Sequence, residues 1–287
     1  ILFIRLPMIT GHAGIGGGIA VVLLGCSASF LTSLSMSAIA TNGVPKGGGC
    51  FSIIKESIGP EFGGTVGCLL FLSNCFGLAM YVLAFVEILQ GWAESDGTDL
   101  RVGVRPLGII TMGCLFTIVY IGISYISKAA IVFLSLVLLS IISIWAGTLE
   151  HAMFSDFLMT NQTAYHGIPG MSTKLIRENM AAKFAGDYPS FASCLAVFFP
   201  AVTDPLAGSN LSGDLKDPQH SIPPGTIFAV LATTTIFCVQ VLFAGGSCER
   251  EALVSDSLIV SKLAWPAKEL VLLGMCMSTL GAGLQSL

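Results

Sequence analysis

The segment Phe191–Thr226, FASCLAVFFPAVTDPLAGSNLSGDLKDPQHSIPPGT, contains the pattern that decides the fold. It begins as an apolar helix, is interrupted by Pro200, Asp204 and Pro205, and then resumes. A break inside a membrane is costly unless the freed backbone groups line a cavity, because hydrocarbon offers no hydrogen-bond partner. Secondary transporters bind ions and small solutes at such breaks near the midplane. The segment therefore predicts half of a transport site.

The composition of the whole chain indicates a membrane protein. Of its 287 residues, 54% are hydrophobic and 10% are charged, and the mean hydropathy is +0.84. Soluble domains carry about 25% charged residues. A helix needs ~20 apolar residues to cross the hydrocarbon core. Uncharged windows of at least that length occur at Ile19–Val44, Phe62–Val86, Pro106–Ser127, Ala129–Leu149 and Ser221–Ser247.

We expect one transmembrane transport domain over residues 1–287, with no soluble module and a long loop at about 150–187. Lys128 separates two apolar windows and predicts a tight turn between adjacent helices. The chain begins and ends inside apolar runs, so we expect it to be a piece of a longer protein without a signal peptide. The expected helices are Ile1–Thr10 (the end of a first helix), Gly18–Ala40, Gly63–Gln90, Pro106–Ile126, Ala129–Leu149, the broken Tyr188–Ser212, Ser221–Phe243 and one beginning near Trp265.

Charge and motif content argue against several other classes of protein. The formal net charge is −4 and basic clusters are missing from the sequence, which argues against a nucleic-acid partner. The nine cysteines include no CxxC pair, so we expect neither a disulfide framework nor a metal site. The glycine clusters do not match a phosphate-binding loop. We therefore expect no cofactor, and nothing in the sequence supports an enzyme.

The segment Phe191–Thr226 closely resembles the sixth helix of the cation-chloride cotransporters, whose pattern is FFPxxTGIxAGxNxSGDLxDxQxSIPxGT. Further blocks occur in the same order along almost the whole chain, and the potassium-chloride branch of the family is nearest. These blocks are ILFIRL at Ile1–Leu6, SMSAIATNGV at Ser35–Val44, GPEFGG at Gly59–Gly64, AMYVLAFVEI at Ala79–Ile88, LAWP at Leu263–Pro266 and STLGAGLQSL at Ser278–Leu287.

The resemblance implies an all-α membrane protein with the inverted-repeat fold of the amino acid–polyamine–organocation superfamily. The chain would be an incomplete copy, from the end of helix 1 to part of helix 8. By analogy the loop Glu150–Asp187 lies outside the cell, where Asn161 of the sequon Asn161-Gln162-Thr163 could be glycosylated. A count of lysines and arginines favours the opposite orientation, but long loops weaken that rule. The resemblance also implies a multi-pass protein of the plasma membrane, embedded in the lipid bilayer, and a homodimer when full length.

The function implied is symport of potassium and chloride ions without sodium. In the family, backbone carbonyls of the broken helices hold potassium together with a threonine and a tyrosine hydroxyl. The matching positions are Pro200, Thr203 and Tyr81. Several neutral oxygens suit a weakly hydrated monovalent cation, because they replace its water shell. From the residues alone, Tyr81 fits a packing or interfacial tyrosine better, and it is the resemblance that favours a ligand.

The chloride positions depart from the family pattern. Family members bind chloride through backbone N–H groups at two resumed half-helices, where the helix dipole favours anions. Ile1 matches the last residue of the first set, and Asp204, Pro205 and Leu206 match the second. Pro205 has no N–H, and an ionised Asp204 would repel chloride. Either Asp204 is protonated or turned away, or this chloride position is lost.

Two further comparisons with the family concern sodium and gating. Sodium-coupled members carry paired serines on helix 8, where this chain has Gly281 and Ala282. The resemblance therefore implies sodium-independent transport. Arg5 and Glu87 match residues that close the outer vestibule as a salt bridge in the potassium-chloride branch. The alternative for this pair is two side chains that reach the membrane interface separately.

Two other functions remain open from the sequence. An amino-acid or polyamine transporter of the same superfamily could use Asp204 to recognise an amine or to carry a proton. A non-transporting partner that modulates a related cotransporter would tolerate the altered chloride positions.

Overall fold

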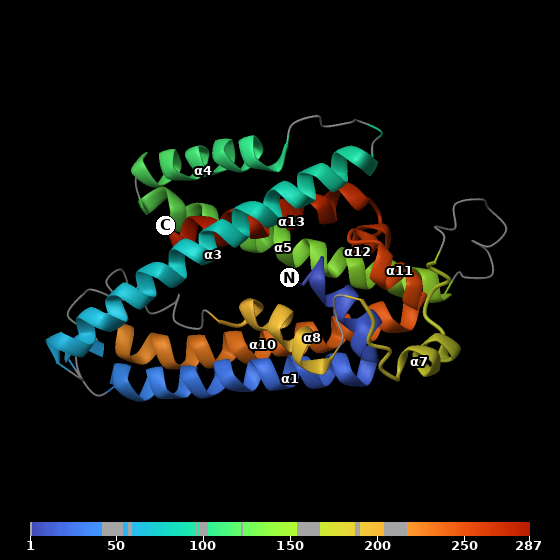
Figure 1. The fold of residues 1–287 in the computed structure, drawn as a ribbon, viewed down its shortest axis with the longest axis horizontal. Helices are drawn as coiled ribbons and strands as arrows, with labels where there is room; N and C mark the ends of the chain where they lie inside the picture. Colours follow the sequence, from blue (N-terminus) through green and yellow to red (C-terminus); the bar gives the residue numbers. More distant parts are fainter. Residues whose placement is uncertain are drawn as a thin grey trace. The chain divides into compact units, whose positions relative to one another are not determined.

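A computed structural model describes residues 2–41, 54–56, 59–95, 97, 103–121, 123–153, 167–186, 190–203 and 217–287. All regular elements within these ranges are helices (Figure 1). They are α1 (Arg5–Thr41), α3 (Pro60–Ser95), α4 (Val104–Ile121), α5 (Ile123–Met153), α7 (Thr173–Asn179), α8 (Phe191–Phe198), the 3-10 helix η1 (Phe199–Ala201), α10 (Pro218–Ser247), α11 (Arg250–Ser255), α12 (Ile259–Lys262) and α13 (Lys268–Ser286).

Five helices of the described part are long and apolar enough to cross a membrane, namely α1, α3, α4, α5 and α10. These helices correspond to the long apolar windows of the sequence, so the expectation of an all-helical, multi-pass membrane protein is confirmed. The shorter apolar helix α8 has eight residues. At 1.5 Å per residue it covers about 12 Å, less than half of a hydrocarbon core of ~30 Å.

The long helix α1 contains the boundary expected between the first two helices. Gly14 has φ 72° and ψ 172°, which interrupts the helical path between the segments expected at Ile1–Thr10 and Gly18–Ala40. A Cβ atom on Gly14 would lie 2.7 Å from the carbonyl oxygens of Met180 and Ala181. Glycine is therefore required here both for its backbone conformation and for the close approach of a neighbouring chain segment.

The turn expected at Lys128 is wrong. The helix α4 ends at Ile121 and α5 begins at Ile123, so Lys128 lies within α5. A single lysine has good helix propensity and does not end a helix. The charge therefore marked the wrong residue.

The chain divides into two compact units, which are described separately. The first comprises Ile1–Leu69 and Ala164–Ser257, and the second comprises Leu70–Thr163 and Leu258–Leu287. The single transport domain expected from the sequence stays a prediction.

In the first unit, α1 packs lengthwise against α10 and also contacts α7, α8 and α11 (Figure 1). Its apolar core includes Val21 and Val22 of α1, Phe198 of α8 and Val241 of α10. The ring of Phe198 meets that of Phe237 edge to face, with centroids 5.3 Å apart. This geometry is one that aromatic pairs prefer. It fixes the end of the short helix α8 against α10.

In the second unit, α13 packs against α5, and both reach close contact through small residues. A Cβ atom on Gly274 of α13 would overlap the Oγ atom of Ser140. The Ser140 hydroxyl donates to the carbonyl of Leu270 at 3.1 Å, and the Ser143 hydroxyl donates to that of Trp265 at 2.7 Å. Helices in lipid commonly associate through such small and hydroxylated residues. A smaller apolar cluster joins α3, α4 and α13 through Leu78, Val82, Leu115 and Leu284.

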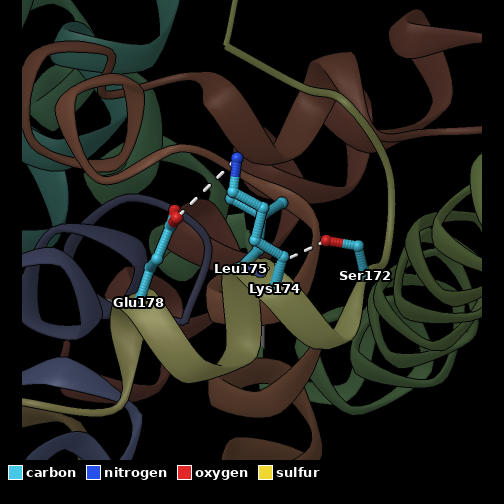
Figure 2. Close-up of polar contacts among 4 residues, drawn as sticks. All are labelled: Ser172, Lys174, Leu175 and Glu178. Carbon is cyan, nitrogen blue, oxygen red and sulfur yellow. Dashed lines mark hydrogen bonds and ion pairs between the residues drawn. The ribbon is translucent and has the colours of Figure 1, made fainter.

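Ser172 caps the N-terminus of the short helix α7. The Ser172 hydroxyl accepts a hydrogen bond from the backbone N–H of Leu175 at 3.2 Å (Figure 2). Figure 2 also shows Lys174 and Glu178 one turn apart, with Nζ and Oε1 separated by 3.9 Å. These two side chains are 82% and 57% exposed, so their ion pair adds little stability.

The segment 167–186 is attached to α10 and α11 by a reciprocal pair of caps. Asn179 is 2% exposed, and its amide donates to the carbonyls of Gly245 and Cys248 at 2.7 and 3.0 Å. Arg250 donates in the other direction, to the carbonyls of Glu178 and Ala181 at 3.0 and 2.7 Å. Carbonyls at the ends of two helices, which lack intrahelical donors, are thereby satisfied. The backbone N–H of Lys183 also donates to the His12 carbonyl at 2.8 Å, close to the Gly14 interruption.

We predict that Asn179→Ala lowers the thermal unfolding midpoint of the full-length protein in detergent. The change leaves the buried carbonyls of Gly245 and Cys248 without this donor, a loss of about 1–3 kcal/mol. Lys174→Ala is the matched control on the same helix, and removing its exposed ion pair should alter stability by at most ~0.5 kcal/mol. Equal midpoints for the two variants would show that the caps do not hold the segment.

Candidate functional site

The helix that the sequence predicts to be broken ends close to the predicted interruption. Regular α-helix begins at Phe191 after Ser190, whose hydroxyl accepts from the N–H of Ser193 at 3.3 Å, and it ends at Phe198. The chain continues as η1, and Val202 then leaves the helical region with φ −125° and ψ 9°. The resumption expected at Leu206 lies outside the described residues.

Pro200 is the local cause of the break. Proline has no N–H, so it cannot donate to the carbonyl of Ala196 four residues back. The following bonds bend the chain into a tight turn, which we call the 199–203 turn after its residues. Within it the N–H of Val202 donates to the Phe199 carbonyl at 3.0 Å. The Thr203 hydroxyl donates to the Pro200 carbonyl at 3.2 Å.

The structure therefore brings two of the predicted cation ligands together. The carbonyl oxygen of Pro200 and the hydroxyl oxygen of Thr203 are separated by a hydrogen-bond distance. Pro200 is half-buried and Thr203 is exposed in the chain as described. Both groups are neutral oxygen donors, the type that can replace water around a monovalent cation.

Two residues of α1 support this turn, and sequence reasoning missed both. The Ser29 hydroxyl donates to the carbonyl of Val202. One helical turn earlier, a Cβ atom on Gly25 would lie 2.9 Å from Cε1 of the Phe198 ring. The signal in the sequence was the spacing of Gly25, Ser29 and Ser33, which marks one face of a helix. That spacing indicates close packing but not which element packs there.

Tyr81, the third predicted cation ligand, belongs to the second unit. It lies half-buried on α3 between the core residues Leu78 and Val82. A Cβ atom on Gly283 of α13 would be 3.9 Å from the Cβ atom of Tyr81. Tyr81 therefore lies on the face of α3 that is close to α13. Pro200 and Thr203 belong to the first unit. A site shared by all three residues stays a prediction.

The gate pair is also divided between the units. Arg5 is the first residue of α1, and Glu87 lies on α3, each half-buried. Their salt bridge stays a prediction. The candidate chloride residues Ile1, Asp204, Pro205 and Leu206 and the glycosylation site Asn161 lie outside the described residues.

The position matched to the sodium-binding serines is tightly packed. A Cβ atom on Gly281 of α13 would lie 3.0 Å from Cδ2 of Phe133 on α5. Neither Gly281 nor Ala282 has a side-chain oxygen. A serine side chain at position 281 would therefore require the Phe133 ring to move.

Several apolar helices long enough to span a membrane, with a short one that ends at a proline, fit a membrane transporter, and the family match supports this class. Residues 1–285 match the amino acid permease family. The chain belongs to this family, and it has the all-helical fold of the amino acid–polyamine–organocation superfamily. It is a multi-pass membrane protein.

The chain is also similar to a relative whose description is more specific. The chain is 38% identical, over an alignment 318 residues long, to cation-chloride cotransporter 1 of Arabidopsis thaliana. The alignment covers 100% of this chain and 32% of the relative. The chain thus spans about a third of the length of the curated protein that it matches.

Proposed function

We propose that this chain is part of a symporter that moves potassium together with chloride across the plasma membrane, without sodium. The observation that carries the proposal is the pairing of the Pro200 carbonyl with the Thr203 hydroxyl at the interruption of an apolar helix. Similarity along the whole chain to a cation-chloride cotransporter supports a cation and chloride as the transported ions.

The cation would be held by neutral oxygens. The Pro200 carbonyl and the Thr203 hydroxyl supply two, and Tyr81 would supply a third. A carboxylate in such a set would favour small or multiply charged ions, whereas several neutral oxygens suit potassium. The exposure of Thr203 leaves its oxygen accessible to an ion.

The proposal that transport does not require sodium rests on two residues of α13. A sodium ion requires close oxygen ligands, and the matched positions Gly281 and Ala282 offer none from their side chains. The contact between Gly281 and Phe133 supports this proposal, since the ring fills the space beside the position.

Rubidium uptake tests the proposed function directly. In cells expressing the full-length protein, with ouabain and bumetanide present, we expect rubidium uptake that disappears when chloride is replaced by gluconate. Replacing external sodium with N-methylglucamine should leave that uptake unchanged. Chloride-independent uptake of amino acids or polyamines would instead support an amine transporter, the alternative that the matched family name favours. No uptake of either kind, together with altered transport by a coexpressed cotransporter, would support a modulatory partner.

The chloride site is proposed at Ile1, Asp204, Pro205 and Leu206, where this chain differs from the family pattern at the last three. If Asp204 is ionised there, it repels chloride by about 1 kcal/mol or more. We therefore expect Asp204→Gly to lower the half-saturating chloride concentration about fivefold. Asp204→Asn, which removes the charge but keeps the size, should do the same. Unchanged chloride dependence in both variants would mean that Asp204 does not face the anion.

We also propose that Arg5 and Glu87 close the outer side of the site as an ion pair. An ionised group in a membrane helix usually pairs or faces water, because its insertion costs ~2.5–3.5 kcal/mol. In a Thr203→Cys background, Arg5→Ala should speed modification by an impermeant external thiol reagent two- to fivefold, as expected for an ion pair worth about 0.5–1 kcal/mol. Arg5→Lys keeps the charge and serves as the control. Equal rates for the two variants would remove the gate assignment.

A further inference from the structure

The 199–203 turn is anchored on α1 through the carbonyl of Val202. The Ser29 hydroxyl donates to this oxygen across 173 positions of sequence. Ser29 is 6% exposed, so water does not compete freely for the bond. The bond is part-buried, and a carbonyl without a donor inside a membrane carries a desolvation cost, which Ser29 removes for Val202 at the end of the helix.

Ser29 differs from the other hydroxyl residues on its face of α1. Ser33, Ser37 and Thr41 each donate to the carbonyl four residues earlier on α1, at 2.8, 2.7 and 3.0 Å. Serine in a helix commonly bonds in this way. The Ser29 hydroxyl instead reaches a carbonyl outside its own helix.

Close packing at Gly25, one helical turn before Ser29, allows the Ser29 hydroxyl to reach the Val202 carbonyl. Gly25 has no side chain, so the Phe198 ring lies directly against α1, where a Cβ atom would be 2.9 Å from the ring. A Cβ atom there would also be 3.5 Å from Val202. The start of the turn is thus held by packing at Phe198, and its end is held by the Ser29 bond at Val202.

Pro200 lies between these two fixed points, and Thr203 follows the second directly. We propose that Ser29 is a positioning residue for the cation site, because its bond to Val202 keeps the Pro200 carbonyl beside the Thr203 hydroxyl. This inference rests on the proposed function. Without the Ser29 hydroxyl the turn loses its hydrogen bond to α1, and the released Val202 carbonyl becomes a competing ligand. Both changes disturb the number and spacing of oxygens on which cation selectivity depends.

The test compares rubidium uptake by the full-length protein and its variants, normalised to the amount at the cell surface. Ser29→Ala should raise the half-saturating rubidium concentration about three- to tenfold, the factor that loss of one hydrogen bond gives. It should also reduce the preference for rubidium over lithium. Maximal uptake at saturating rubidium should stay within about twofold of wild type, since the transport cycle itself is intact.

Ser37→Ala is the matched control, because it removes an equally buried hydroxyl that bonds only within α1. Its half-saturation and ion preference should equal those of wild type. If Ser29→Ala does not reach the surface, Ser29→Cys provides the same comparison with a side chain of similar size and weaker donor strength. Half-saturation and selectivity like those of Ser37→Ala, in a protein whose wild type transports rubidium with chloride, would overturn the positioning role alone. A wild type without such uptake would overturn the proposed function, and this inference with it.

Discussion

A peptide carbonyl inside a membrane must find a hydrogen-bond donor or an ion, because hydrocarbon supplies neither. The break after Phe198 shows how this chain meets that constraint. Phe199, Pro200 and Val202 each have a carbonyl that accepts a bond in or beside the turn, from Val202 N–H, Thr203 and Ser29 in that order. The Thr203 hydroxyl can rotate away and leave the Pro200 carbonyl free to bind an ion. The Ser29 hydroxyl instead keeps the Val202 carbonyl hydrogen-bonded.

The helices also need to pack closely against one another, and glycine allows this at several places. Gly25 admits the Phe198 ring against α1, and Gly274 brings α13 within reach of Ser140 on α5. At Gly14 the missing side chain makes room for the backbone of Met180 and Ala181. In lipid these contacts cannot rely on a hydrophobic driving force between helices, so packing and hydrogen bonds must stabilise them. Asn179 supplies such bonds at the end of α10, and Arg250 supplies them at the end of α7.

Local signals in the sequence predicted the long helices and the end of α8 near Pro200. They did not predict contacts between residues that are far apart in the sequence. The length of each apolar window predicted a membrane-spanning helix, and Pro200 predicted where a helix ends. Both signals depend only on residues within one helix. Lys128 misled because a charge was read as a turn, although a helix accommodates lysine readily. Ser29 could not be assigned a partner, since its face pattern is shared with Ser33 and Ser37, and only the fold shows which one meets Val202.

In the proposed site some residues would contact the ion directly, and others would hold those residues in position. A carbonyl ligand has no side chain to identify it, so substitution at Pro200 alters the backbone path as well as the oxygen. Its orientation depends on supports elsewhere, here the packing of Phe198 against Gly25 and the bond from Ser29. In the proposed site the motif of α8 and η1 would supply the ligands, and the neighbouring helix α1 would determine how they are held.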